Sequence, residues 1–94
     1  VLGHALFLAR DFDAAEDALR RRIRRNPATD ASRLILVSLL GHRGRADEAR
    51  AEWAELLRHH PGFVLAERRK GWFYSNPADE EFVVEGLRRA GLGE

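Results

Sequence analysis

The sequence predicts an all-α fold in which three antiparallel helical hairpins follow one another. The first observation is a repeat, because Ala15 and Ala49 stand 34 residues apart and the same step leads to Val83. The second is punctuation, since Pro27 and Pro61 end helices at the same place in two successive copies. A repeat of this length is typical of stacked helical hairpins, in which each unit packs mainly on its neighbours.

Composition limits the chain further. Its 94 residues predict one domain, and 45% hydrophobic with 33% charged side chains argue against a disordered segment. The absence of cysteine excludes disulfides and thiolate zinc sites, and a net charge of +1 gives no overall attraction to nucleic acid. The longest apolar run, residues 34–40, is far shorter than the ~20 residues of a membrane-spanning helix. We therefore expect a cytoplasmic protein without membrane contact.

The first copy covers about residues 1–29. It is read as a helix to about residue 9, a turn at Arg10 and Asp11, and a second helix over 12–25 that Asn26-Pro27 ends. The chain starts at Val1 inside this copy, so the first hairpin is expected to be truncated and the chain to be part of a longer protein. The apolar residues left poorly covered would then favour a homo-oligomer; they are Leu2, Leu6 and Phe7.

The second copy covers about residues 30–63, with helices over 30–42 and 46–59 joined by a turn at Gly44. The first of these helices is apolar nearly all round, whereas a surface helix carries a single apolar stripe. This pattern favours a helix enclosed by its neighbours on both sides. The alternative is the floor of a groove that binds a partner.

The third copy covers about residues 64–94, with helices predicted over 64–74 and 77–90. Asn76 is a good N-cap, Pro77 suits the first helical position, and Gly91 follows the second helix as a left-handed stop.

The repeat resembles the tetratricopeptide repeat over essentially the whole chain. Small, bulky and proline residues stand at the family's eighth, twentieth, twenty-fourth and thirty-second places: Gly3, Gly71, Ala15, Ala49, Leu19, Trp53, Leu87, Pro27 and Pro61. The resemblance implies an α-solenoid of three hairpins that acts as a non-catalytic scaffold for protein-protein interaction. A structural spacer or homo-oligomerisation module is the alternative.

In this family the first helices of the hairpins line a concave groove that holds a peptide or protein. The resemblance places these residues in the groove: His4, Phe7, Leu8, Leu34, Ser38, His42, Arg68 and Trp72. Trp72 would be the aromatic anchor and Arg68 would meet an acidic group of the partner. Packing of Trp72 beneath the last helix is the alternative.

A narrower likeness concerns residues 76–79 and 84–92. Together with parts of the second copy, they are similar to the closing segment of bacterial proteins that join a class III adenylate or guanylate cyclase domain to such repeats. The likeness implies the C-terminal region of a larger bacterial protein and carries over no catalytic residue.

Five arginines stand among residues 20–25, and they allow two interpretations. An anion or nucleic-acid site is one of them. The favoured one is a solvated helix end, because bases at a helix C-terminus suit its dipole and because Glu16 and Asp17 are spaced to pair with Arg20 and Arg21.

No pattern in the sequence indicates an enzyme, a cofactor or a metal site. The adjacent His59 and His60 point about 100° apart on a helix and cannot chelate one ion together. The hydroxyl residues stand in no arrangement that would activate a nucleophile.

Overall fold

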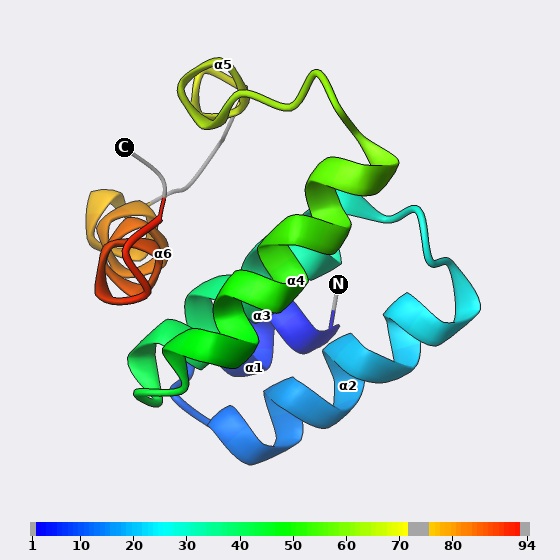
Figure 1. The fold of residues 1–94 in the computed structure, drawn as a ribbon. Coiled ribbons are helices and arrows are strands. Elements are labelled where there is room, and N and C mark those ends of the chain that lie inside the picture. The colour runs from blue at the N-terminus through cyan, green and yellow to red at the C-terminus, as the bar shows by residue number, and fades with distance from the viewer. Residues whose placement is uncertain (1, 72–75, 93–94) are drawn as a thin grey trace.

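The computed structural model describes residues 2–71 and 76–92, and every regular element within these ranges is a helix. Figure 1 shows these helices in chain order: α1 (Leu2–Leu8), α2 (Phe12–Arg25), α3 (Asp30–His42), α4 (Ala46–His59), α5 (Leu65–Arg69) and α6 (Pro77–Arg89). The predicted all-α class is confirmed, and α2, α3 and α4 have the predicted bounds. None of these helices is long and apolar enough to cross a membrane.

Several helix ends are fixed by the residues that the sequence supplies there. Asp11, Thr29 and Asn76 each accept a hydrogen bond from a backbone N–H in the first turn of α2, α3 and α6, which satisfies donors that a helix start leaves unpaired. Gly44 and Gly91 follow α3 and α6 with φ values of 74° and 77°, a conformation that glycine adopts readily. The predicted cap at Asn76 and the stop at Gly91 are therefore confirmed.

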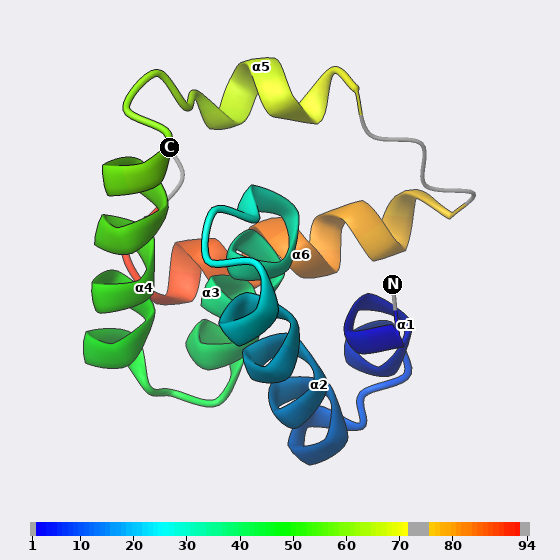
Figure 2. The ribbon, with the colours of Figure 1, turned by 90° about the vertical axis from the view of Figure 1, so that its right-hand side faces the viewer.

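The helices of the first two predicted hairpins pack on each other in pairs. α1 packs on α2, α3 packs on α4, and α2 also packs on α3 (Figure 2). Gly3 brings α1 close to α2, since a Cβ at this position would lie 2.7 Å from Cγ of Leu19. Ala15 and Ala49 hold matching places in the two hairpins and are both fully buried. Small residues of the repeat thus lie inside the helix packing, as close helix approach requires.

The third predicted hairpin is different. The prediction of one helix over 64–74 is wrong, because α5 ends at Arg69 and a turn follows at Lys70 and Gly71; residues 72–75 lie outside the described ranges. Leu65 is the buried residue of α5, and α5 makes only sparse contacts with the other helices. A short helix gains too little from such packing to extend through a glycine.

The last helix, α6, packs on α3 rather than on α5. In Figure 2, α6 passes across α3, while α5 lies apart at the edge of the molecule. A Cβ at Gly41 of α3 would overlap with the carbonyl group of Gly86, and a Cβ at Gly86 would overlap with both oxygens of Ser38. The two helices therefore cross with backbone against backbone, which the close packing of a protein interior permits only for small residues.

α3 is the centre of the core. It contacts α1, α2, α4 and α6, and its residues 32–41 are all buried. The interpretation that neighbours enclose this apolar helix is confirmed. One of those neighbours is the last helix of the chain, which the repeat alone does not indicate.

The α3–α6 crossing makes a direct prediction about stability. Gly86→Ala should lower the free energy of unfolding by about 1–3 kcal/mol, because the added methyl group overpacks the crossing and outweighs the gain of up to about 1 kcal/mol in helix propensity. Urea unfolding followed by circular dichroism measures this change.

Gly62→Ala is the matched control, because a Cβ there would meet nothing within 4 Å. It should change stability by less than about 0.5 kcal/mol. Equal stability of both variants would contradict a tight crossing.

Candidate partner-binding face

The predicted groove residues lie on α1, α3 and α5 or beside them. Phe7, Leu34 and Ser38 are buried. The half-buried ones are His4, Leu8, His42 and Arg68, and Trp72 lies outside the described residues. Phe7 and His42 come together, with ring centroids 6.0 Å apart. The expectation that Phe7 is poorly covered is wrong, because its side chain has no exposed surface.

Phe82 of α6 lies against Phe7 and His42. Its ring is stacked on His42 with centroids 3.9 Å apart, and its centroid is 5.0 Å from that of Phe7 and 6.1 Å from that of Phe12. The guanidinium carbon of Arg10 lies 3.4 Å from the centre of the Phe82 ring. Aromatic and cation–π contacts of this kind each add to the energy of apolar burial.

Two hydrogen bonds join the same face of α3 to the backbone of α6. The hydroxyl of Ser38 donates to the carbonyl oxygen of Val83 at 2.7 Å, and both groups are buried. Nε2 of His42 lies 2.6 Å from the carbonyl oxygen of Phe82 and must donate, because a carbonyl only accepts. Two of the predicted groove residues are thus bonded to the chain's own last helix.

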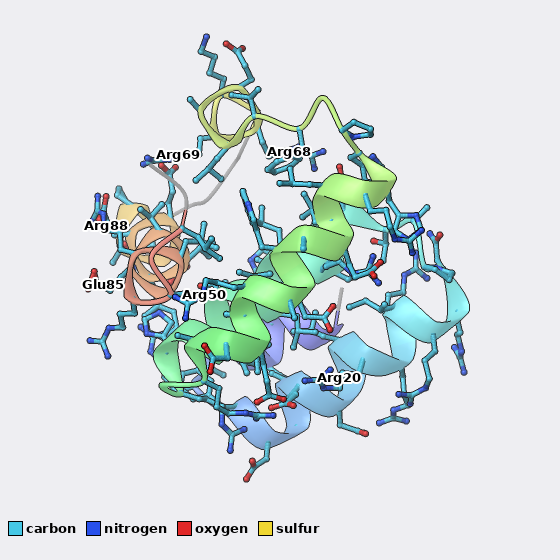
Figure 3. All side chains as sticks on the ribbon, viewed as in Figure 1. Arg20, Arg50, Arg68, Arg69, Glu85 and Arg88 are labelled. Atoms are coloured by element: carbon cyan, nitrogen blue, oxygen red, sulfur yellow. The ribbon has the colours of Figure 1, made fainter. Side chains whose placement is uncertain are left out.

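Ion pairs attach α5 and α6 to their surroundings. Arg68, predicted to meet an acidic partner, pairs instead with Asp30 of α3. Arg69 of α5 pairs with Glu80 of α6 at 2.8 Å. Figure 3 shows Arg69 between these two helices and Arg50 of α4 beside the end of α6, where its guanidinium donates to the Ala90 carbonyl at 3.3 Å.

The arginine-rich end of α2 is only partly neutralised. Arg20 pairs with Glu16 at 2.9 Å, and Arg21 pairs with Asp17, so both predicted pairs are present. Among the described residues, no acidic partner is found for the three remaining arginines, which are all exposed: Arg22, Arg24 and Arg25. By contrast, basic residues near the C-terminal ends of α4 and α6 are paired with acids. Arg58 pairs with Glu55, and Arg89 pairs with Glu85.

The pKa values of His42 and Glu16 are both lowered, but for different reasons. Burial lowers the pKa of His42, the hydrogen bond to the Phe82 carbonyl raises it, and the charges of Arg89 and Arg10 lower it further against a smaller opposing effect of Glu85. The pKa of Glu16 is also lowered: burial would raise it, but hydrogen bonds from Arg20 and Arg45 outweigh that effect. His42 is therefore neutral at physiological pH and Glu16 is ionised.

The described residues hold no group of three or more His, Asp or Glu side chains arranged for a metal ion. His60 is bonded to the carbonyl oxygen of Ala28 and His59 lies 4.0 Å from Glu55. Neither arrangement gathers the ligands that a closed metal site requires.

Comparison with protein-family models, curated proteins and solved structures finds no match.

Sequence reasoning did not identify the α6 side of this face. It assigned no role to Phe82, Gly86 or Gly41. A signal was present, because a glycine within a helix lowers its stability by about 1 kcal/mol and commonly marks a close approach. Two such glycines, one on α3 and one on α6, could have suggested that these helices meet.

The lowered pKa of His42 predicts a loss of stability in mild acid. Above the ordinary imidazole pKa of about 6.5, His42 is neutral in both the folded and the unfolded chain. Below it the unfolded chain takes up the proton first, so the stability falls until the pH passes the lower pKa of the folded state. His42→Gln should therefore lose less stability than the wild type between about pH 7.5 and about pH 5.5.

Urea unfolding at the two pH values measures the difference. His4→Gln is a second test of the same effect, because burial also lowers the pKa of His4, so this variant should likewise lose less stability than the wild type. An identical loss in the wild type and in both variants would contradict the assignment.

Proposed function

We propose that this chain is a tetratricopeptide-like array that serves as a non-catalytic scaffold for protein-protein interaction. The observation that carries the proposal is the pair of stacked hairpins α1–α2 and α3–α4, in which Ala15 and Ala49 are buried at matching positions. A repeated unit with a common packing position is the architecture that the resemblance implies. In this proposal α6 completes the array by packing on α3, although among the described residues it forms no packed hairpin with α5.

The likeness of residues 76–79 and 84–92 to the tails of cyclase-linked repeat proteins supports a further part of the proposal. The chain would be the C-terminal region of a larger cytoplasmic bacterial protein whose catalytic domain lies elsewhere. Its own part would be to hold that protein, or a partner, in place.

The position of α6 on α3 limits where a partner can bind. Phe7 and Ser38 are buried and in contact with α6, so a peptide can reach them only after α6 has moved. A partner that leaves α6 in place must contact the outer surface of the hairpins. Within the described residues this surface offers little apolar area, with Val64 as its exposed large hydrophobic side chain, so polar contacts would hold the partner.

A test of the scaffold uses a partner captured from the source cell, identified by mass spectrometry and purified. Its affinity for the intact chain is then measured by calorimetry. Gly41→Ala should weaken binding at least about tenfold, because the array loses its packing, whereas Gly62→Ala should leave the affinity unchanged. Equal affinity for both variants, or capture of no partner by the folded chain beyond that by an unfolded one, would contradict the proposal.

The three arginines without acidic partners favour a second candidate function, binding of an acidic group at the end of α2. Elsewhere in the described chain, arginines such as Arg43 and Arg45 are paired with acids, whereas this end brings together three arginines without an acidic partner among the described residues. Three cations within one helical turn suit a short acidic segment better than a nucleic acid, because each neutralised phosphate adds to affinity and three contacts give only weak binding at physiological salt.

Replacement of Arg22, Arg24 and Arg25 by Gln should lower the salt concentration that elutes the protein from a polyanionic column, because unpaired charges are lost. A control triple variant changes Arg58, Arg88 and Arg89, which are near acidic side chains, and loses the same net charge. It should elute closer to the wild type. Equal shifts for the two triple variants would show that net charge alone determines binding.

A further inference from the structure

The arginines in the last turn of α2 differ from the other arginines of the described chain. Each of the others contacts an acidic side chain, except Arg10, which lies over the Phe82 ring. Arg22, Arg24 and Arg25 are exposed, and within the described residues they neither contact an acid nor donate to a backbone carbonyl. The arginines without a partner in this part of the chain are therefore near neighbours.

The helix dipole does not account for this cluster by itself. A dipole favours bases in the last turn of any helix, and α4 and α6 also end in arginines. There, however, Arg58 pairs with Glu55 and Arg89 with Glu85. In α2 three like charges stand within one turn, and like charges at this spacing destabilise a helix. An anion bound from outside would relieve their repulsion.

The turn that follows α2 is fastened by side chains from two other helices. Nη1 of Arg33, a buried residue of α3, donates to the carbonyl oxygen of Pro27 at 2.9 Å. Nε2 of His60, at the end of α4, donates to the carbonyl oxygen of Ala28. The backbone that carries the free arginines is therefore held in place before any ligand arrives, which reduces the entropy that binding must cost.

We propose that the end of α2 binds the phosphorylated side chain of a partner segment, with Arg22 and Arg25 holding the phosphate. The proposal rests on the second candidate function above and names its acidic group. Residues three apart lie on one side of a helix, with Cβ atoms about 5–6 Å apart. A phosphate monoester carries a charge of about −1.5 to −2 at pH 7 and three acceptor oxygens, so it can accept hydrogen bonds from both guanidinium groups. A single carboxylate brings one charge and two oxygens.

The choice of arginine and the place of the cluster agree with this ligand. The planar guanidinium group donates two parallel hydrogen bonds to a phosphate, whereas lysine acts only as a point charge. Arg24 points about 100° away from Arg25 around the helix, where it can meet an acidic residue that flanks the phosphate. Figure 1 shows this end of α2 on the opposite side of the molecule from α6. A segment bound there leaves the α3–α6 crossing in place.

The test compares four ligands on the intact chain. Three are short peptides that are identical except at one central position, which is phosphoserine, glutamate or serine; the fourth is inorganic phosphate. Dissociation constants are measured from the NMR shifts of the α2 backbone amides. We expect the phosphoserine peptide to bind at least about tenfold more tightly than the glutamate peptide, and the serine peptide and inorganic phosphate to bind more weakly than the phosphoserine peptide.

Variants that keep the net charge separate the guanidinium geometry from the charge. The double variant Arg22→Lys, Arg25→Lys should weaken binding of the phosphoserine peptide at least about fivefold. The matched control is Arg88→Lys, Arg89→Lys, on the opposite side of the molecule, and it should bind this peptide as the wild type does. All of these positions are exposed, so the fold should be unchanged, as circular dichroism can check.

Three results would overturn the proposal and leave the second candidate function in place. The first is equal affinity for the phosphoserine and glutamate peptides. The second is a lysine variant at positions 22 and 25 that binds the phosphoserine peptide as tightly as the wild type, since charge alone would then be enough. The third is inorganic phosphate that binds as tightly as this peptide, which would indicate a site for a free ion. Binding of neither the phosphoserine nor the glutamate peptide would contradict the second candidate function as well.

Discussion

The close crossing of α3 and α6 requires a position without a side chain on each helix, and much of the structure depends on it. With Gly41 and Gly86 in contact, the Ser38 hydroxyl reaches the Val83 carbonyl at 2.7 Å. The same approach places Val83 and Leu87 in the core without exposed surface. Burial of a side chain of this kind is worth about 1.5–3 kcal/mol. A wider crossing would lose this burial and leave polar groups without partners, so the energy of the core and the geometry of the backbone are coupled here.

Charge makes a second, weaker contribution to the arrangement. Glu16 of α2 pairs with Arg45 at 2.8 Å, at the turn between α3 and α4, and Arg33 of α3 pairs with Glu52 of α4 at 3.3 Å. Arg33 is buried, and a buried pair loses much of its attraction to the cost of removing both charges from water. These pairs therefore do not by themselves hold the hairpins together. They do favour one register of the hairpins over others, because a displaced helix would bring like charges together.

The difference between what the sequence predicted and what the structure contains follows from the kind of information that each pattern holds. Pro27, Pro61 and Gly44 act through the local backbone, and the helices that they delimit have the predicted bounds. The extent of α5 depends on tertiary contacts that the repeat implies, and among the described residues α5 makes only sparse contacts with the other helices. The groove residues were assigned from the family's positions, and periodicity indicates which side of a helix is apolar without indicating what covers it. The covering side chain is Phe82, which stacks on His42 of α3. Phe82 belongs to α6, a helix that the repeat assigned to the next hairpin.

Because α6 is bonded to Ser38 and His42 of α3, a partner that binds to this face of α3 must displace α6. A helix joined by a short connection to the face on which it packs competes there with an effective concentration in the millimolar range. The apparent affinity of an external helix for this face is its intrinsic affinity multiplied by the small fraction of time in which α6 leaves the face free. A helix that made only the contacts of α6 would therefore compete poorly unless it were present at comparable concentration. A different protein would need contacts beyond those of α6, on the outer surfaces of the hairpins, and the unpaired arginines at the end of α2 are the group of described residues best placed to supply them.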